Sequence, residues 1–157
     1  MRRTDKEITD RAIMLRIIEQ CQVCRLGLAH ANIPYVLPVS FGYADGTLYF
    51  HTACEGRKIE FLTANPTVCV EFEHDVRLVP HDTSPCKWTF SFQSVIGYGR
   101  VQELTDAASK TAGLNQIMRH YSGREWPMDV ENLDAIRVWK VPIENLTGKQ
   151  SKDKLGS

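Results

Sequence analysis

The sequence predicts a mainly β fold, in which six antiparallel strands form a β-barrel with about three helices around it. Two observations lead to this prediction. Apolar and polar residues alternate in short segments through most of the chain. The Asp45-Gly46 pair, typical of a tight hairpin turn, lies between two of these segments. Six mainly antiparallel strands of this length tend to close into a barrel, because closure removes exposed strand edges.

The first half of the chain begins with a helical pattern. Its apolar residues share one helix face, and Thr9 or Asp10 can cap its start. Three strands are expected to follow, over residues 23–30, 34–43 and 47–53. The second and third should pair across the Asp45-Gly46 turn. Because prolines donate no ladder hydrogen bond, Pro34 and Pro38 favour an edge position or a bulge.

The second half alternates between strands and helices. We expect a short helix over 57–65, a strand over 67–73, a long loop over 74–88 and a long strand over 90–104. Gly97 and Gly99 mark a bend or bulge in that strand. A helix capped by Asp106 should run to about residue 121, followed by a helical turn at 130–133 and a strand over 135–143. The polar tail, residues 147–157, is expected to fray unless something holds it.

The composition indicates one globular domain over residues 1–149, with a polar tail over 150–157. The chain has 157 residues, of which 43% are apolar, enough to bury a core. The 19 basic and 19 acidic residues balance, so no basic stripe for nucleic acid is expected. No apolar run could span a bilayer and no signal-peptide core follows the charged start. Five cysteines, an odd number, favour reduced thiols and a cytoplasmic location.

One segment, residues 49–58 with the sequence Y-F-H-T-A-C-E-G-R-K, has the pattern of an anion site. A strand ends near Ala53, a short loop contains Gly56, and Arg57 and Lys58 open a helix. A helix start presents free N–H groups and favours an anion, and Gly56 lets the backbone approach a ligand closely. Arg57 can bind phosphate oxygens in pairs, and Lys58 adds a point charge. The same pattern also occurs on solvated surface, so spacing alone leaves both readings open.

His51 lies in the strand before this loop. It shares one strand face with Tyr49 and Ala53, and Phe50 and Thr52 share the other. A hydrogen-bonded structural histidine is one interpretation. The other is an imidazole beside a cofactor ring or substrate, able to donate a hydrogen bond or a proton.

Several motifs in order resemble one family. The motif L-Y-F-H-T-A-x-E-G-R-K is preceded by V-L-P-V-S-F-G-Y and followed by S-V-I-G-Y-G-R-V, with C-x-V-C-R-L-G-L before them and N-L-T-G-K after them. Together, from residue 2 to residue 149, they resemble the FMN-binding split-barrel superfamily of pyridoxamine 5′-phosphate oxidase, and most closely its nitroimidazole-resistance branch. The extra basic and aromatic substrate residues of the oxidases proper are missing near the C-terminus, which argues against vitamin-B6 oxidation.

The resemblance implies a split barrel, a homodimer and FMN in a groove between the subunits. Gly56, Arg57 and Lys58 would then hold the phosphate, and His51 would be the catalytic group. The backbone of two segments would lie beside the ring and ribityl chain: Pro38, Val39, Ser40 and Phe41 in the first, and His51, Thr52 and Ala53 in the second. A third segment, Ser94 and Val95, would approach the cofactor from the partner subunit. FAD stays possible, because phosphate-binding residues do not exclude a dinucleotide.

The function expected from this resemblance is an FMN-dependent oxidoreductase that reduces small electron-poor molecules such as nitroimidazoles. The alternative is a flavin- or haem-binding carrier or sensor without turnover, and an apo structural dimer is a third option. Neither the physiological substrate nor the electron donor follows from the sequence.

Other polar residues are assigned no chemistry. Cys21 and Cys24 are expected to be structural, since no second pair completes a zinc site. Cys54 lies in the proposed phosphate loop and should be exposed. The spacing of the His and Cys residues within 74–88 matches no metal template, so a mobile polar loop is expected there. A loop of this length could also help to shape a substrate pocket.

Overall fold

A computed structural model describes residues 4–154, so the first three and last three residues, including the start of the predicted domain and the end of the tail, lie outside it. Its strands are β1 (Glu7–Ile8), β2 (Cys24–His30), β3 (Ile33–Val39), β4 (Gly42–Ala44), β5 (Thr47–Ala53), β6 (Thr67–Val79), β7 (Thr89–Arg100), β8 (Gln102–Leu104) and β9 (Ile136–Gln150). Its helices are α1 (Arg11–Gln20), α2 (Arg57–Ala64), α3 (Ala107–Ser122) and α4 (Val130–Asp134). Short 3-10 turns cover Thr4–Lys6, Pro85–Lys87 and Lys152–Lys154. No helix within residues 4–154 is both long and apolar enough to cross a membrane.

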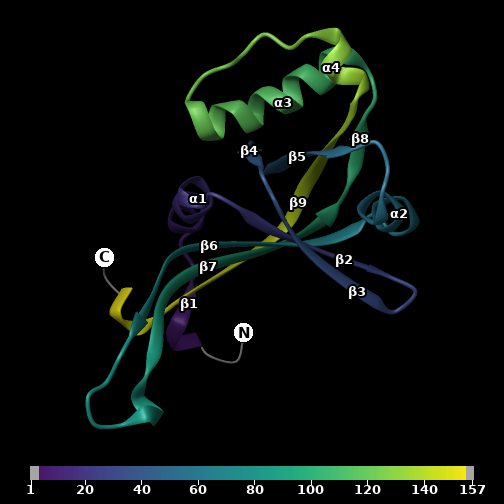
Figure 1. The fold of residues 1–157 in the computed structure, drawn as a ribbon. Coiled ribbons are helices and arrows are strands. Elements are labelled where there is room, and N and C mark those ends of the chain that lie inside the picture. Colours follow the sequence, from purple (N-terminus) through teal and green to yellow (C-terminus); the bar gives the residue numbers. More distant parts are fainter. Residues whose placement is uncertain (1–3, 155–157) are drawn as a thin grey trace.

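The strands form one antiparallel sheet in the order β3-β2-β6-β7-β9-β5-β4, with β1 and β8 added along β9. Strand β9 joins the two halves, because its first part pairs with β5 and its second part with β7. The sheet curls strongly, and α1 and α3 lie on the same side of the β6–β7 layer (Figure 1). The mainly β antiparallel fold is therefore confirmed.

Within residues 4–154 the sheet has nine strands rather than six and does not close, since β3 and β4 are its two ends. This open sheet is consistent with the predicted split barrel, whereas the strand number and the closure expected from the strand pattern were predicted wrongly. The predicted strand over 34–43 is two strands, because the Phe41 side chain turns into the core and its N–H donates to Tyr121 Oη at 3.1 Å. Of these two strands, β4 pairs with β5 as predicted, whereas β3 pairs with β2. The strand over 90–104 is likewise broken where the Val101 N–H donates to the Pro66 carbonyl at 2.8 Å.

Most local signals were read correctly. Asp45 and Gly46 have φ of 48° and 76°, as a hairpin turn with two left-handed residues requires. Pro34 and Pro38 lie in the edge strand β3, as their missing N–H groups predicted. Asp10 caps α1, and Asp106 caps α3 by accepting from the Ser109 N–H at 2.9 Å.

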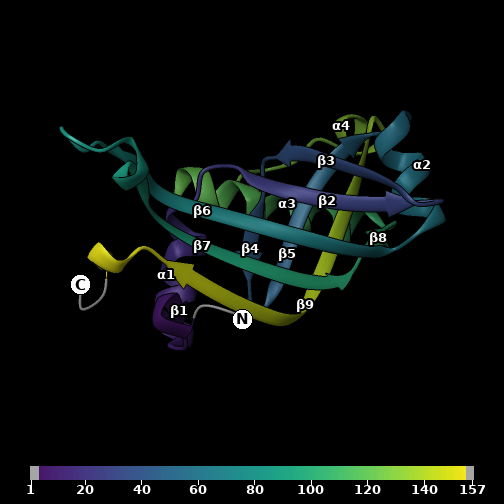
Figure 2. The same ribbon diagram turned by 90° about the horizontal axis from the view of Figure 1, so that it is seen from below.

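The loop over 74–88 and the frayed tail were not predicted correctly. A bulge between His74 and Arg77 lets β6 continue pairing with β7 as far as Val79, so only residues 80–88 form a loop. This two-stranded ribbon projects beyond the rest of the sheet (Figure 2). The tail is held in place as far as Lys154: β9 continues to Gln150, the Ser151 N–H donates to the Phe92 carbonyl, and Lys154 pairs with Asp75.

The core lies inside the curled sheet. Its largest fully buried side chains include Phe41, Phe50 and Phe72, and the apolar face of α1 packs against them. A second, smaller cluster joins α3 to β9 through Leu114, Ile117 and Val138. Burial on both faces explains why β9 alternates poorly in the sequence: Val138 enters the small cluster, whereas Trp139 enters the main core.

Candidate functional site

The strongest site candidate is the turn between β5 and α2. Gly56 begins α2 with φ 114° and ψ 170°, and a Cβ at this position would meet nothing within 4 Å. Its carbonyl accepts the N–H of Ile59 at 2.9 Å, but within the described chain no side chain caps the helix start. The first N–H groups of α2 therefore have no side-chain partner in the described chain, which is the arrangement that binds an anion.

The two cations at this helix start differ in their surroundings. The Arg57 guanidinium lies over the Tyr35 ring, 5.0 Å from its centroid, and 5.4 Å from that of Phe61. It is thereby held toward strand β3. Lys58 is half-buried, and burial lowers the pKa of its ammonium group. A partly buried cation beside an uncapped helix start gains stability from a bound anion.

His51 is the second element of the site. Its side chain lies on the exposed face of β5, opposite Val138 in the ladder, as the alternation predicted. Partial burial, and next the positive charge of Lys58, lower the pKa of His51. The imidazole is therefore neutral at neutral pH, and it can donate one hydrogen bond and accept another.

A titration checks this electrostatic link. Replacing Lys58 with methionine should raise the pKa of His51 toward its ordinary value of 6.5, because one of its two lowering causes is removed. The His51 ring signals followed by NMR against pH would show the change. Arg57→Met is the matched control and should leave the pKa of His51 unchanged. An unchanged His51 titration in Lys58→Met would contradict the link.

Thr52 and Ala53 contribute differently. Thr52 is buried, its hydroxyl accepts from Trp139 Nε1 at 3.0 Å and it donates to the Ala53 carbonyl at 2.8 Å. Only the backbone of Thr52 can therefore serve a ligand, whereas Ala53 is exposed. Strand β4 pairs only with Thr47–Tyr49, so the edge of β5 from Phe50 to Ala53 carries no strand on that side within residues 4–154.

The segment after β3 supplies a second free edge. Pro38 and Ser40 are exposed, and Val39 and Phe41 are buried. Because β3 ends the sheet of residues 4–154, no strand of that part of the chain pairs with its outer edge. The contact of Arg57 with the Tyr35 ring places the start of α2 beside β3.

Sequence reasoning missed the group that fixes this segment. The Tyr121 hydroxyl accepts the Phe41 N–H and donates to the Gln22 carbonyl at 2.7 Å. Next to it, His120 Nε2 lies 2.8 Å from the Cys21 carbonyl oxygen. Both side chains come from the end of α3, and no local pattern signals a contact over this sequence distance.

Ser94 and Val95 do not join the rest within one chain. Val95 is fully buried, and Ser94 lies opposite Lys149 of β9. His51 lies opposite Val138 of the same strand, eleven residues away. At about 3.3 Å per residue this is on the order of 35 Å along the strand. One chain alone therefore does not surround a flavin with all the predicted residues.

The cysteines agree with their predicted surroundings. Cys21 and Cys24 are buried, and burial raises the pKa of both thiols. Cys54 is exposed and in no disulfide, with its Sγ 3.6 Å from the Asp134 carbonyl oxygen. Within residues 4–154, no three His, Cys, Asp or Glu side chains gather as metal ligands.

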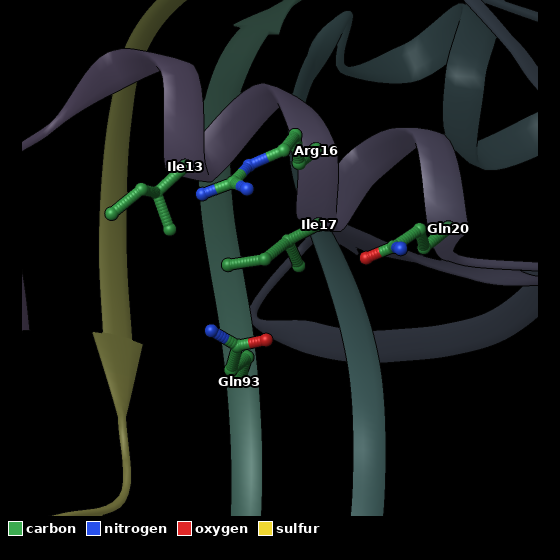
Figure 3. Close-up of a pocket in the computed structure, with 5 residues that line it drawn as sticks. All are labelled: Ile13, Arg16, Ile17, Gln20 and Gln93. Carbon is green, nitrogen blue, oxygen red and sulfur yellow. The ribbon is translucent and has the colours of Figure 1, made fainter. Parts of the chain in front are cut away.

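A separate hollow of about 170 Å³ lies between α1 and β7 (Figure 3). The Ile17 side chain lies between Arg16 and Gln93, and Ile13 and Gln20 flank them. None of the predicted flavin residues lines it, so it is not part of the candidate site.

Comparison with known proteins decides the family. The model of the pyridoxamine 5′-phosphate oxidase family matches residues 10–150. The chain belongs to this family. Among curated proteins, none matches the chain.

Three solved structures that are similar to the chain include one nitroimidazole resistance candidate and two cofactor-binding proteins. A candidate 5-nitroimidazole antibiotic resistance protein from Bacteroides thetaiotaomicron is 35% identical over 91% of this chain and 85% of that one, with a TM-score of 0.81. The flavocytochrome Anf3 from Azotobacter vinelandii is 21% identical over 96% and 72%, with a TM-score of 0.80. An FAD and haem binding protein from Mycobacterium smegmatis is 17% identical over 94% and 74%, with a TM-score of 0.78. This family member thus has a fold that flavin-binding proteins use.

Proposed function

We propose that this chain is an FMN-binding oxidoreductase that acts as a homodimer and reduces small electron-poor molecules such as nitroimidazoles. The observation that carries the proposal is the uncapped start of α2, where Gly56 and Lys58 follow β5 and Arg57 lies over Tyr35 of the edge strand β3. The 35% identity to a candidate nitroimidazole resistance protein supports the substrate class.

The residues present fit a flavin mononucleotide. The open space at Gly56 admits a phosphate, and the first N–H groups of α2, with Lys58, would bind its oxygens. Arg57 would reach the same phosphate from its place on Tyr35. The backbone of 38–41 and of 51–53 would bind polar atoms of the ring and ribityl chain. FAD would use the same phosphate residues.

The bound flavin would supply the electron-transfer chemistry. His51 would orient the substrate or give up a proton at one of its ring nitrogens. Because the lowered pKa keeps this ring neutral at neutral pH, its first contribution is a hydrogen bond, and a cationic His51 would become common only at lower pH.

A second copy of the chain would complete the site. Ser94 lies too far along β9 from His51 to serve the same flavin within one chain. On the outer face of the sheet Val36, Ile96 and Tyr98 are exposed, and an apolar sheet face of this kind is suited to a partner copy.

Purified protein tests the function. We expect a yellow protein whose released chromophore has the mass of FMN, and whose reduced flavin is reoxidised by 2-methyl-5-nitroimidazole without oxygen. His51→Ala should keep the flavin and slow reoxidation by about a hundredfold, the lower range for loss of a proton-transfer group. Flavin without reoxidation would indicate a carrier or sensor, and a Soret band would indicate haem. Reoxidation at the wild-type rate in His51→Ala would remove His51 from the mechanism.

A further inference from the structure

The outer face of the β6–β7 ribbon has a hollow of about 400 Å³, which we call the outer hollow. It is lined by Glu71, Glu73, Val76, Phe90, Phe92 and Ser94. Phe90 is 53% exposed, and the exposed side chains of Ile96 and Tyr98 continue the apolar surface along β7. Exposed aromatic side chains beside a hollow indicate a binding surface.

The lining of the outer hollow favours one kind of ligand. Two phenyl rings, Phe90 and Phe92, offer their surfaces to a flat ring. Burial, and next the neighbouring charge of Glu73, raise the pKa of Glu71, so this pair of carboxylates gains from a positive charge or a proton donor nearby. Arg25 forms ion pairs with both carboxylates, at 3.8 Å from Glu71 and 3.7 Å from Glu73, but at these distances it makes no hydrogen bond to either. The pKa of Glu71 stays raised beside Arg25, so the pair still favours a further cation or N–H donor. Lys149 lies over the Phe92 ring at 5.8 Å.

The end of the described chain holds this surface in shape. The Phe92 N–H donates to Ser151 Oγ at 3.1 Å, and Ser91 donates to Asp153 at 2.6 Å. Lys154 pairs with Asp75 at the bulge of β6. A hollow that is already ordered loses little entropy on binding, which favours affinity.

The outer hollow cannot serve the flavin of its own chain. It contains Ser94, whose ladder position on β9 is eleven residues from that of His51. The projecting ribbon carries the hollow away from α2, which lies at the opposite end of the molecule (Figure 2). Two copies could pack with their outer faces together around a two-fold axis that runs across the strands. This axis would exchange the two ends of the molecule, so each hollow would meet the α2 end of the other copy.

We propose that the outer hollow is the substrate-binding wall of the flavin site in a second copy, and that it selects flat aromatic substrates carrying a positive charge or N–H donors. The inference rests on the proposed function for the flavin itself. Phe90 and Phe92 contact the substrate ring, and Glu71 and Glu73 bind its cationic or N–H group.

Ligand binding tests the selectivity without requiring turnover. Benzylamine, a cation at neutral pH, should bind the flavin-loaded protein about tenfold or more tightly than benzoate, as the two carboxylates favour a cation. Calorimetry and the flavin absorbance both report the binding. The E71Q/E73Q variant should retain its flavin and lose the preference. The E19Q/E144Q variant removes two negative charges elsewhere and should keep the preference for benzylamine. Equal binding of the two ligands, or a preference that survives E71Q/E73Q, would overturn the proposal.

Mixed dimers test whether the hollow serves a second copy. Chains carrying Arg57→Ala and Lys58→Ala are unfolded and refolded together with E71Q/E73Q chains and FMN. If the hollow serves the partner, one site in each mixed dimer pairs intact flavin residues with an intact hollow, and the benzylamine preference returns. If it serves its own chain, the only flavin site has a changed hollow and no preference returns, which would overturn the proposal. A colourless wild-type protein would contradict the proposed function instead, and calorimetry with benzylamine would still test the hollow.

Discussion

The double variant Arg57→Ala, Lys58→Ala should fold and retain no flavin. Each charge-assisted hydrogen bond to a phosphate contributes about 1.5–3 kcal/mol, so losing both cations should weaken FMN binding by about a thousandfold. The fold should persist, because Arg57 is exposed and contacts only the surfaces of Tyr35 and Phe61, and Lys58 is half-buried without a salt-bridge partner in the described chain. Flavin absorbance per chain after gel filtration measures occupancy, and circular dichroism measures folding.

The control for this variant removes the same charge elsewhere. Arg16 and Arg100 are both exposed and outside the candidate site. The Arg16→Ala, Arg100→Ala variant should keep full flavin occupancy. Full occupancy in the Arg57, Lys58 variant as well would place the phosphate at another part of the fold, and His51 would then lose its connection to the cofactor.

The second large effect concerns stability. Gly42→Ala should destabilise the fold by about 3 kcal/mol, the upper range for overpacking, since the contact is with rigid backbone. A Cβ on Gly42 would lie 2.3 Å from the carbonyl carbon and oxygen of Gln116 in α3, and 2.5 Å from the Ile117 nitrogen. The helix would have to move away from β4, and Tyr121, which holds Phe41, lies in the same helix.

Urea unfolding checks this prediction. The midpoint should fall while the slope stays the same, which indicates a change in stability alone. Gly27→Ala is the matched control in strand β2, because there a Cβ would meet its nearest atom, the Cys69 carbonyl oxygen, at 3.4 Å. A wild-type midpoint for Gly42→Ala would mean that α3 does not approach β4 this closely.

The sequence predicted the elements whose signals are local. The Asp45-Gly46 turn, the Asp10 and Asp106 caps and the strand over 47–53 depend on residues within a few positions of one another. The same holds for Gly56, Arg57 and Lys58 at the start of α2. For His51, the alternation of a strand was sufficient to predict that it shares a face with Tyr49 and Ala53. Local chemistry indicated an anion site at Gly56, Arg57 and Lys58, whereas the family motifs made that anion a flavin phosphate and gave His51 a catalytic role.

Long-range contacts decided the rest. The strand predicted over 34–43 breaks because Tyr121 takes the Phe41 N–H, and β6 extends past its predicted end because a bulge restores its pairing with β7. The tail is ordered because Lys154 reaches Asp75 and Ser151 reaches Phe92. Such partners are tens of residues apart, so no short window contains both members.

The sequence by itself thus determined a mainly β chain and its turns and caps, and it predicted one segment as a phosphate site. Only the tertiary structure decided that, within residues 4–154, the sheet stays open with β3 and β4 as its two ends. It also separated Ser94 from His51 and placed Glu71, Glu73 and two phenyl rings in one hollow. The physical reason is that local conformation depends on neighbouring residues, whereas the surroundings of a site depend on which distant strands pair.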